Sequence, residues 1–252
     1  MTTATATAAA KLFVDTRKSK RPIPAIPEEL VPQTREEAYA IQDGIIALQG
    51  PVGGWKVATG TGPEPVCSPL PASVYIESGE NFSIGGWLAT LIETEVAVKL
   101  GRDLPARSTP YTRAEVKAAM ASLHPAIEVI GSRFAPEITL PKLLGIGDLQ
   151  NNAAVLTGPA ITDWSGLDLA HLKISLRTGG VEIGTADGGP DIEAIIDALT
   201  WLANHAGARQ GGLRAGQIII TGSRIVRPIG KPGEAVEADF GALGSLKIGL
   251  VA

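Results

Sequence analysis

Two glutamates on one expected strand carry the clearest chemical signal in this sequence. Residues 92–100 alternate as a strand does, with one face formed by Ile92, Thr94, Val96, Val98 and Leu100. Glu93 and Glu95 therefore share the other face, about 6.6 Å apart along the strand, close enough to converge on one small ion. Glu128 is a third isolated acid, inside the apolar run 125–130. Carboxylates without cysteine or histidine nearby suit a hard cation, so these three predict a Mg²⁺ or Mn²⁺ site.

A structural explanation of the same residues stays open at this point. A Glu-x-Glu pair is often the water-facing side of a half-exposed sheet. Glu128 could pair with Arg133 or lie on an edge strand, and a lone lysine such as Lys56, beside Gly53 and Gly54, is ordinarily a surface residue. Acids are rarely fully buried unless they are paired or bind a metal. The residue types alone do not decide between these readings.

Five segments, taken in order, resemble the 2-keto-4-pentenoate hydratase family of the wider fumarylacetoacetate hydrolase superfamily. They are EEAYAIQ (36–42), GGWKVATG (53–60), IETEVAVKLGRDLP (92–105), HPAIEVIGSRF (124–134) and ALTWLANHAGARQGGLRAGQIIITGS (198–223). Any single segment would be a weak match, whereas five in the right order make a specific one. The resemblance covers most of the chain.

The resemblance implies a role for each candidate residue. It implies metal ligation by Glu93, Glu95 and Glu128, catalysis by Lys56, and substrate binding by Asn152, Thr221 and Gly222. The implied reaction is the metal-dependent hydration of 2-hydroxypenta-2,4-dienoate-like acids to 4-hydroxy-2-oxo acids, in the breakdown of aromatic compounds. The metal would stabilise enolate charge while the lysine transfers a proton. Alternatives are a 4-oxalocrotonate-type decarboxylase, a C–C hydrolase, and a non-catalytic partner subunit.

The sequence departs from the family pattern at the expected pocket wall. The family usually has Asp-Asn-Ala-Ser-Ser after the third ligand strand, whereas this chain has Asn151-Asn152-Ala153-Ala154 followed by Val155. An acid and the hydroxyls are missing there, and the acidic loop that usually follows the lysine is altered as well. Metal and enolate chemistry are therefore better supported than hydration itself.

Composition favours an ordinary globular protein with a small-molecule substrate. Of the 252 residues, 44% are hydrophobic and 19% are charged, and the net charge of −4 provides no basic face for nucleic acid. Cys67 is the only cysteine, which excludes a disulfide framework. No signal peptide or membrane-length apolar run is evident, so we expect a cytoplasmic protein. By the resemblance, we also expect a homo-oligomer.

The pattern of elements indicates an α/β or α+β fold with a curled, mixed sheet. We interpret residues 1–13 as a frayed lead-in, the basic run 17–21 as a solvated arm, 22–32 as extended, and 53–90 as a lid or loop region with short strands. Helices are expected from capping signals and apolar stripes at 34–49, from 112 to about 123, and from 191 to 210. Strands are expected at 92–100, 126–131, 153–157, 172–178, 181–184, 217–221, 234–240 and 244–251. The resemblance implies a β-roll core, and we divide the chain into residues 1–52, an N-terminal arm and helix, and 53–252, a metal-binding catalytic domain.

Overall fold

The computed structural model describes residues 1–58, 64–84, 88–135 and 137–252. Its centre is a mixed, curled sheet with the strand order β2-β1-β12-β5-β7-β8-β3. The strands are β1 (Val52–Ala58), β2 (Val66–Pro71), β3 (Tyr75–Glu77), β5 (Leu88–Leu100), β7 (Met120–Ser132), β8 (Asn152–Thr157) and β12 (Ile218–Pro228). The expected fold class, a mixed sheet roll with helices, is confirmed.

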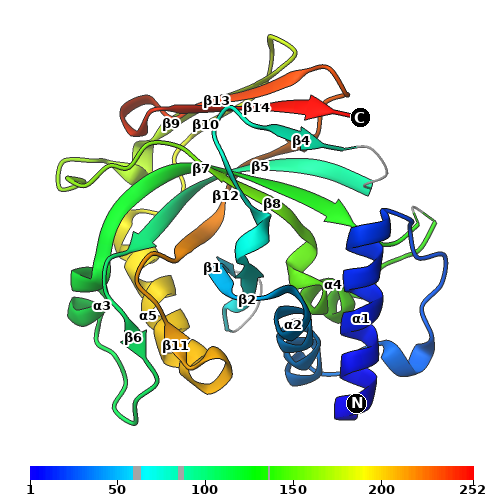
Figure 1. Ribbon diagram of the computed structural model, residues 1–252. Coiled ribbons are helices and arrows are strands. Elements are labelled where there is room, and N and C mark those ends of the chain that lie inside the picture. The colour runs from blue at the N-terminus through cyan, green and yellow to red at the C-terminus, as the bar shows by residue number, and fades with distance from the viewer. Residues whose placement is uncertain (59–63, 85–87, 136) are drawn as a thin grey trace.

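A second sheet of five strands covers one side of the first (Figure 1). Its order is β10-β9-β13-β14-β4. The strands are β4 (Asn81–Ser83), β9 (Lys173–Thr178), β10 (Val181–Asp187), β13 (Ala235–Asp239) and β14 (Ser245–Val251). A short pair, β6 (Leu104–Pro105) and β11 (Gly212–Leu213), lies apart from both sheets. The alternation of apolar residues in β13 and β14 buries Val236, Ala238, Leu246 and Ile248 between the layers.

Helices pack on the large sheet in two groups, and the buried residues form two hydrophobic cores, with α2 and α4 contributing to both. The helices are α1 (Thr3–Ser19), α2 (Arg35–Gln49), α3 (Arg113–Ala119), α4 (Lys142–Gly147) and α5 (Ile192–Gln210). The apolar stripe of α5 packs into the larger core, while Phe13 of α1 and Ile41 of α2 belong to the smaller one. Within the described residues, no helix is long and apolar enough to cross a membrane.

The N-terminal segment corrects two expectations. Residues 1–13 are not a frayed lead-in, because most of them belong to α1, which is capped by Thr2 and buries Ala6, Ala10 and Phe13. Their spacing is the helical repeat of an amphipathic stripe, formed here mainly by alanines. Nor is the run 17–21 a wholly solvated arm, because Arg17 is buried on the same helix face.

Several element boundaries also differ from expectation. The helix that starts after Thr112 ends at Ala119, and Met120 and Leu123 begin the long strand β7 instead. The described part of 53–90 is mostly strand, while 59–63 and 85–87 lie outside the described residues. The helix α4 was not expected, because its six residues are too few to show a helical period.

Candidate metal centre and its cavity

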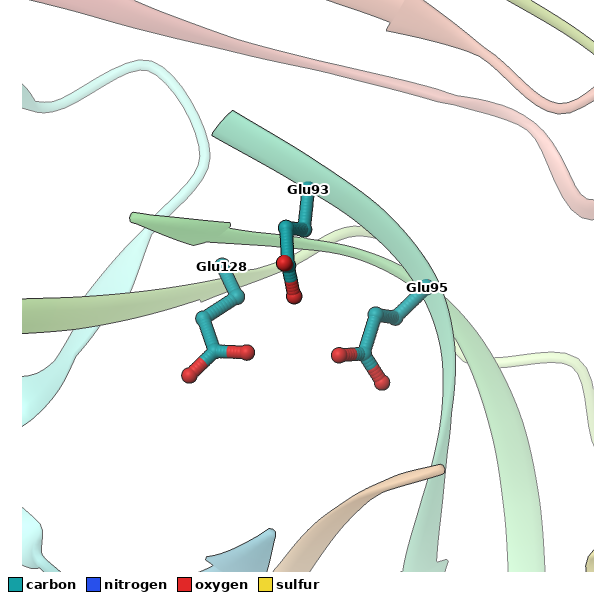
Figure 2. A group of neighbouring side chains, drawn as sticks. All are labelled: Glu93, Glu95 and Glu128. Atoms are coloured by element: carbon teal, nitrogen blue, oxygen red, sulfur yellow. The ribbon is translucent and has the colours of Figure 1, made fainter. Parts of the chain in front are cut away.

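Three carboxylates converge where β5 and β7 lie side by side, and Figure 2 shows them pointing toward one another. Glu93 and Glu95 come from β5, and Glu128 comes from β7 directly opposite Glu93. One oxygen from each acid lies within 4.8 Å of the other two. Glu95 and Glu128 are fully buried, and the side chain of Glu93 is only 17% exposed. The alternative of a water-facing acid pair is therefore wrong for this strand.

Lys56 lies inside the same cluster rather than on the surface. It belongs to β1, which reaches the site through β12, its parallel neighbour in the sheet. Its Nζ lies 2.7 Å from Glu128 Oε2 and 3.9 Å from Glu93 Oε2. Glu128 is thus paired with Lys56 and not with Arg133, which binds Asp148 instead. Burial lowers the pKa of Lys56, but Glu128, Glu93 and Glu95 together outweigh burial and raise that pKa above its ordinary value.

The acids are short of positive charge. Burial raises the pKa of Glu93 to about 7, with Lys56 opposing the shift and Glu128 adding to it. Burial, and then the charge of Glu128, raise the pKa of Glu95 well above its usual range. Within the described part of the chain, Glu95 Oε1 is buried with no hydrogen-bond partner. The cluster has three acids and one lysine, so it lacks positive charge. Its ligand atoms are all carboxylate oxygens, and one of them has no hydrogen-bond partner among the described residues. These features fit a divalent hard cation.

An irregularity in β12 brings its backbone against the cluster. The register of β12 on β5 shifts between Ile220 and Ser223, and Gly222 there has φ +116°, a conformation that glycine adopts without strain. Its N–H donates to Glu95 Oε2 at 2.6 Å. The hydroxyl of Thr221 donates to the Val96 carbonyl at 2.8 Å, which ties β12 to β5. Gly222 lines the cavity described below, whereas Thr221 is buried behind it.

Asn152 supports the third acid from the start of β8. Its Nδ2 donates to Glu128 Oε1 at 2.9 Å, and its side chain is fully buried. The side chain of Asn152 therefore holds a candidate ligand and does not line the cavity. The expected roles of all seven site residues stay predictions, although the structure places every one of them at or beside the cluster.

A cavity of about 440 Å³ opens onto Glu93, Glu95 and Lys56. Its described lining residues are Lys56, Ala58, Glu93, Glu95, Leu140, Pro141, Lys142, Gly145, Ile146, Gln150, Asn151, Gly222 and Ser223. The segment 140–151 was not expected to contribute, apart from Asn151. Cavities of about 450 and 510 Å³ on the second sheet are lined mainly by Ser, Thr and charged side chains, and their described linings contain none of the clustered acids.

A strained turn forms part of the cavity wall. Leu149, Gln150 and Asn151 have φ of 52°, 52° and 59°, so three consecutive non-glycine residues are left-handed. Such residues cost on the order of 1–3 kcal/mol each and persist only where surrounding contacts fix them. Here Asp148 on one side is bound by two buried arginines, and Asn152 on the other side is bound to Glu128. The pairing of Asp148 with Arg17 and Arg133 was not expected from the sequence, since no local pattern relates residues 131 and 15 positions apart.

Comparison with known proteins finds similar sequences and a similar fold. Residues 52–251 match the family model described as fumarylacetoacetate (FAA) hydrolase C-terminal. The chain is 28% identical over 156 residues to a 2-keto-4-pentenoate hydratase of Paraburkholderia xenovorans, an alignment covering 62% of this chain and 57% of that protein. It is 29% identical over 249 residues to the 2-oxo-hept-4-ene-1,7-dioate hydratase of Escherichia coli, covering 91% of each. The structure of 4-oxalocrotonate decarboxylase from Pseudomonas putida G7, complexed with magnesium and adipate, has a TM-score of 0.83 at 19% identity, covering 100% of this chain and 99% of that one.

Proposed function

Since this chain belongs to the fumarylacetoacetate hydrolase C-terminal family, we propose that it is a divalent-metal-dependent lyase for short 2-hydroxy-dienoic or 2-oxo acids. The favoured reaction is hydration of 2-hydroxypenta-2,4-dienoate-like substrates to 4-hydroxy-2-oxo acids. Magnesium or manganese is the proposed cofactor, and the breakdown of aromatic compounds is the proposed context. The relatives named as hydratases support this reading, as does the magnesium bound by the structural neighbour.

The proposal rests on one observation: Glu93, Glu95 and Glu128 lie close together beside a pocket, with Lys56 next to them. Glu93 and Glu95 reach the cavity directly, and Glu128 lies behind it with Lys56 and Asn152 as partners. A non-catalytic partner subunit would have no need for this costly arrangement of buried charges.

The residues of the chain have separate tasks in the proposed reaction. The three glutamates would hold the cation, which supplies positive charge that stabilises negative charge on the substrate oxygens. Lys56 Nζ would give and take the proton that interconverts dienol and ketone. Water then adds across the conjugated double bond, with its hydroxyl on C4 and its hydrogen on C3. Gly222 and Asn152 keep Glu95 and Glu128 in place through their hydrogen bonds.

Decarboxylation of a diacid is the second candidate, and Lys142 favours it. The charged residues among the described cavity lining are Lys56, Glu93, Glu95 and Lys142. Lys56 and Lys142 are the cations of that lining, so the pocket suits a substrate with more than one carboxylate. The missing hydroxyl at Ala154 and the amide at Asn151 also weaken the case for hydration relative to the family pattern.

Two substrates separate the candidates. The purified protein with Mg²⁺ would be incubated with 2-hydroxypenta-2,4-dienoate and with an oxalocrotonate-like diacid, following dienoate absorbance, hydrated product and CO₂. Hydrated product from the monoacid supports the hydratase, and CO₂ without hydrated product makes the protein a decarboxylase. Inertness toward both, with and without metal, would contradict the proposed enzyme. The cytoplasmic location, the homo-oligomeric state and the division at residues 52 and 53 stay predictions.

A further inference from the structure

Arg17 of α1 is joined to the acid cluster by a continuous chain of buried contacts. Its Nη1 donates to the backbone carbonyl of Asn152 at 3.0 Å, and its Nη2 lies 3.1 Å from Asp148 Oδ1. The side chain of Asn152 in turn donates to Glu128 Oε1. All of these residues are buried, so the contacts are shielded from competing water.

From this geometry we propose that Arg17 is a positioning residue for the metal site, acting through Asn152 on Glu128. The inference rests on the proposed metal function of the three glutamates. It assigns a role in the site to α1, which lies outside residues 52–251, the part that matches the family model.

The charge of buried Asp148 is already balanced by Arg133, so charge balance alone does not explain Arg17. Arg133 already pairs with Asp148, with its Nε 2.5 Å from Oδ2. Arg17 is thus a second buried cation on a single acid. Burial, together with the neighbouring charge of Arg17, lowers the pKa of Arg133 to about 10, so the second arginine adds repulsion. Besides its pairing with Asp148, Arg17 also donates to the Asn152 carbonyl, a direct link toward the acid cluster.

The contact between Arg17 and the Asn152 carbonyl fixes the junction between the strained turn at residues 149–151 and strand β8. Residues 149–151 are left-handed, and regular strand geometry starts at Asn152. Without Arg17, the strain in the turn can relax by moving Asn152, and Glu128 loses the donor that orients its Oε1. Loss of a partner that orients a metal ligand typically costs 10–100-fold in metal affinity.

Calorimetric titration of the metal-free protein with Mn²⁺ tests the proposal without relying on turnover. We expect Arg17→Met to weaken Mn²⁺ binding about 10-fold or more, whereas the adjacent, exposed Lys18→Met keeps wild-type affinity. The Arg133–Asp148 pair is retained in Arg17→Met, so we expect this variant to fold. A cooperative urea unfolding transition would show that it does. If Arg17→Met does not fold, the same titration is carried out with Arg17→Lys. That variant keeps a positive charge near Asp148 but lacks the second guanidinium nitrogen that reaches Asn152.

A double-mutant cycle shows whether Arg17 acts through Asn152. Asn152→Ala alone should weaken Mn²⁺ binding, and adding Arg17→Met should weaken it little further, because both changes remove the same support. Fully additive losses, or wild-type affinity in a folded Arg17 variant, would overturn the inference. If the wild-type protein itself binds no Mn²⁺, the proposed metal function fails instead, so the two failures are distinguishable.

Discussion

Each acid of the cluster has different surroundings, and these set its expected sensitivity to mutation. Glu128 is held by Lys56 and Asn152, whereas Glu95 receives one backbone N–H and has a second oxygen without a partner in the described structure. Glu93 alone retains some exposure. Glu95 is therefore the acid whose burial is hardest to explain without a bound cation.

Glu95→Gln should abolish divalent-metal binding while the protein stays folded. Glutamine keeps the size of the side chain but removes the charge, and the neutral form is easier to bury than the carboxylate whose pKa is raised there. Calorimetry with Mg²⁺ or Mn²⁺ measures the loss, with the exposed Glu182→Gln as a control. Wild-type metal affinity in the Glu95 variant would remove this residue from the ligand set.

Lys56→Met should lose turnover but still bind metal. A positioned proton-transfer group typically contributes about 10²–10⁴-fold to rate, and removing a cation from beside Glu128 and Glu93 favours rather than opposes binding of another one. Steady-state kinetics and calorimetry measure the two effects, with the exposed Lys99→Met as control. Near-normal turnover would show that Lys56 only balances charge.

At the scale of elements, the segment between α4 and β8 connects the N-terminal helix to the site. Asp148 forms ion pairs with Arg17 of α1 and with Arg133, which directly follows β7, so one carboxylate joins three parts of the chain. Removing one partner of a buried ion pair strongly destabilises the folded protein, whereas exposed ion pairs contribute little to its stability.

Asp148→Asn should therefore lower the free energy of unfolding by about 3–5 kcal/mol, because it leaves two arginines buried without their acid. Urea unfolding followed by circular dichroism measures the change. The exposed Asp163→Asn is the matched control and should unfold close to wild type. An unchanged unfolding midpoint for Asp148→Asn would show that the network contributes nothing to stability.

Local sequence patterns predicted helices and strands well where the apolar residues kept one period over the whole element. The alternation around Glu93 and Glu95 placed both on one face of β5, and the Thr112 and Glu115 capping box marked the start of α3. The alanine-rich stripe of α1 was missed because alanine gives a weak hydrophobic contrast. The Lys56–Glu128 contact, between residues 72 apart, depends on sheet order, which no local pattern contains. Only the family resemblance had placed the two in one site.

At the scale of the whole molecule, the single thiol reports on the integrity of the larger core. Cys67 on β2 is fully buried, and burial, opposed by Arg209, raises its pKa to about 11. Below that pH the native thiol stays protonated and unreactive, whereas an unfolded thiol ionises near its ordinary pKa. At pH 8 a thiol reagent should label the native protein far more slowly than the protein in urea. Equal rates would mean that this region opens freely.

The proposed function requires that Glu93, Glu95 and Glu128 jointly hold a divalent cation. Anomalous X-ray scattering from a crystal soaked in Mn²⁺ tests it most directly, because the manganese signal locates the ion independently of any activity. We predict one strong peak at oxygen-ligand distance from all three carboxylates, about 2.0–2.6 Å as for hard cations, beside the cavity that Lys56 lines. Absence of a peak there, or a peak bound by other residues, would contradict the metal site and the reaction built on it.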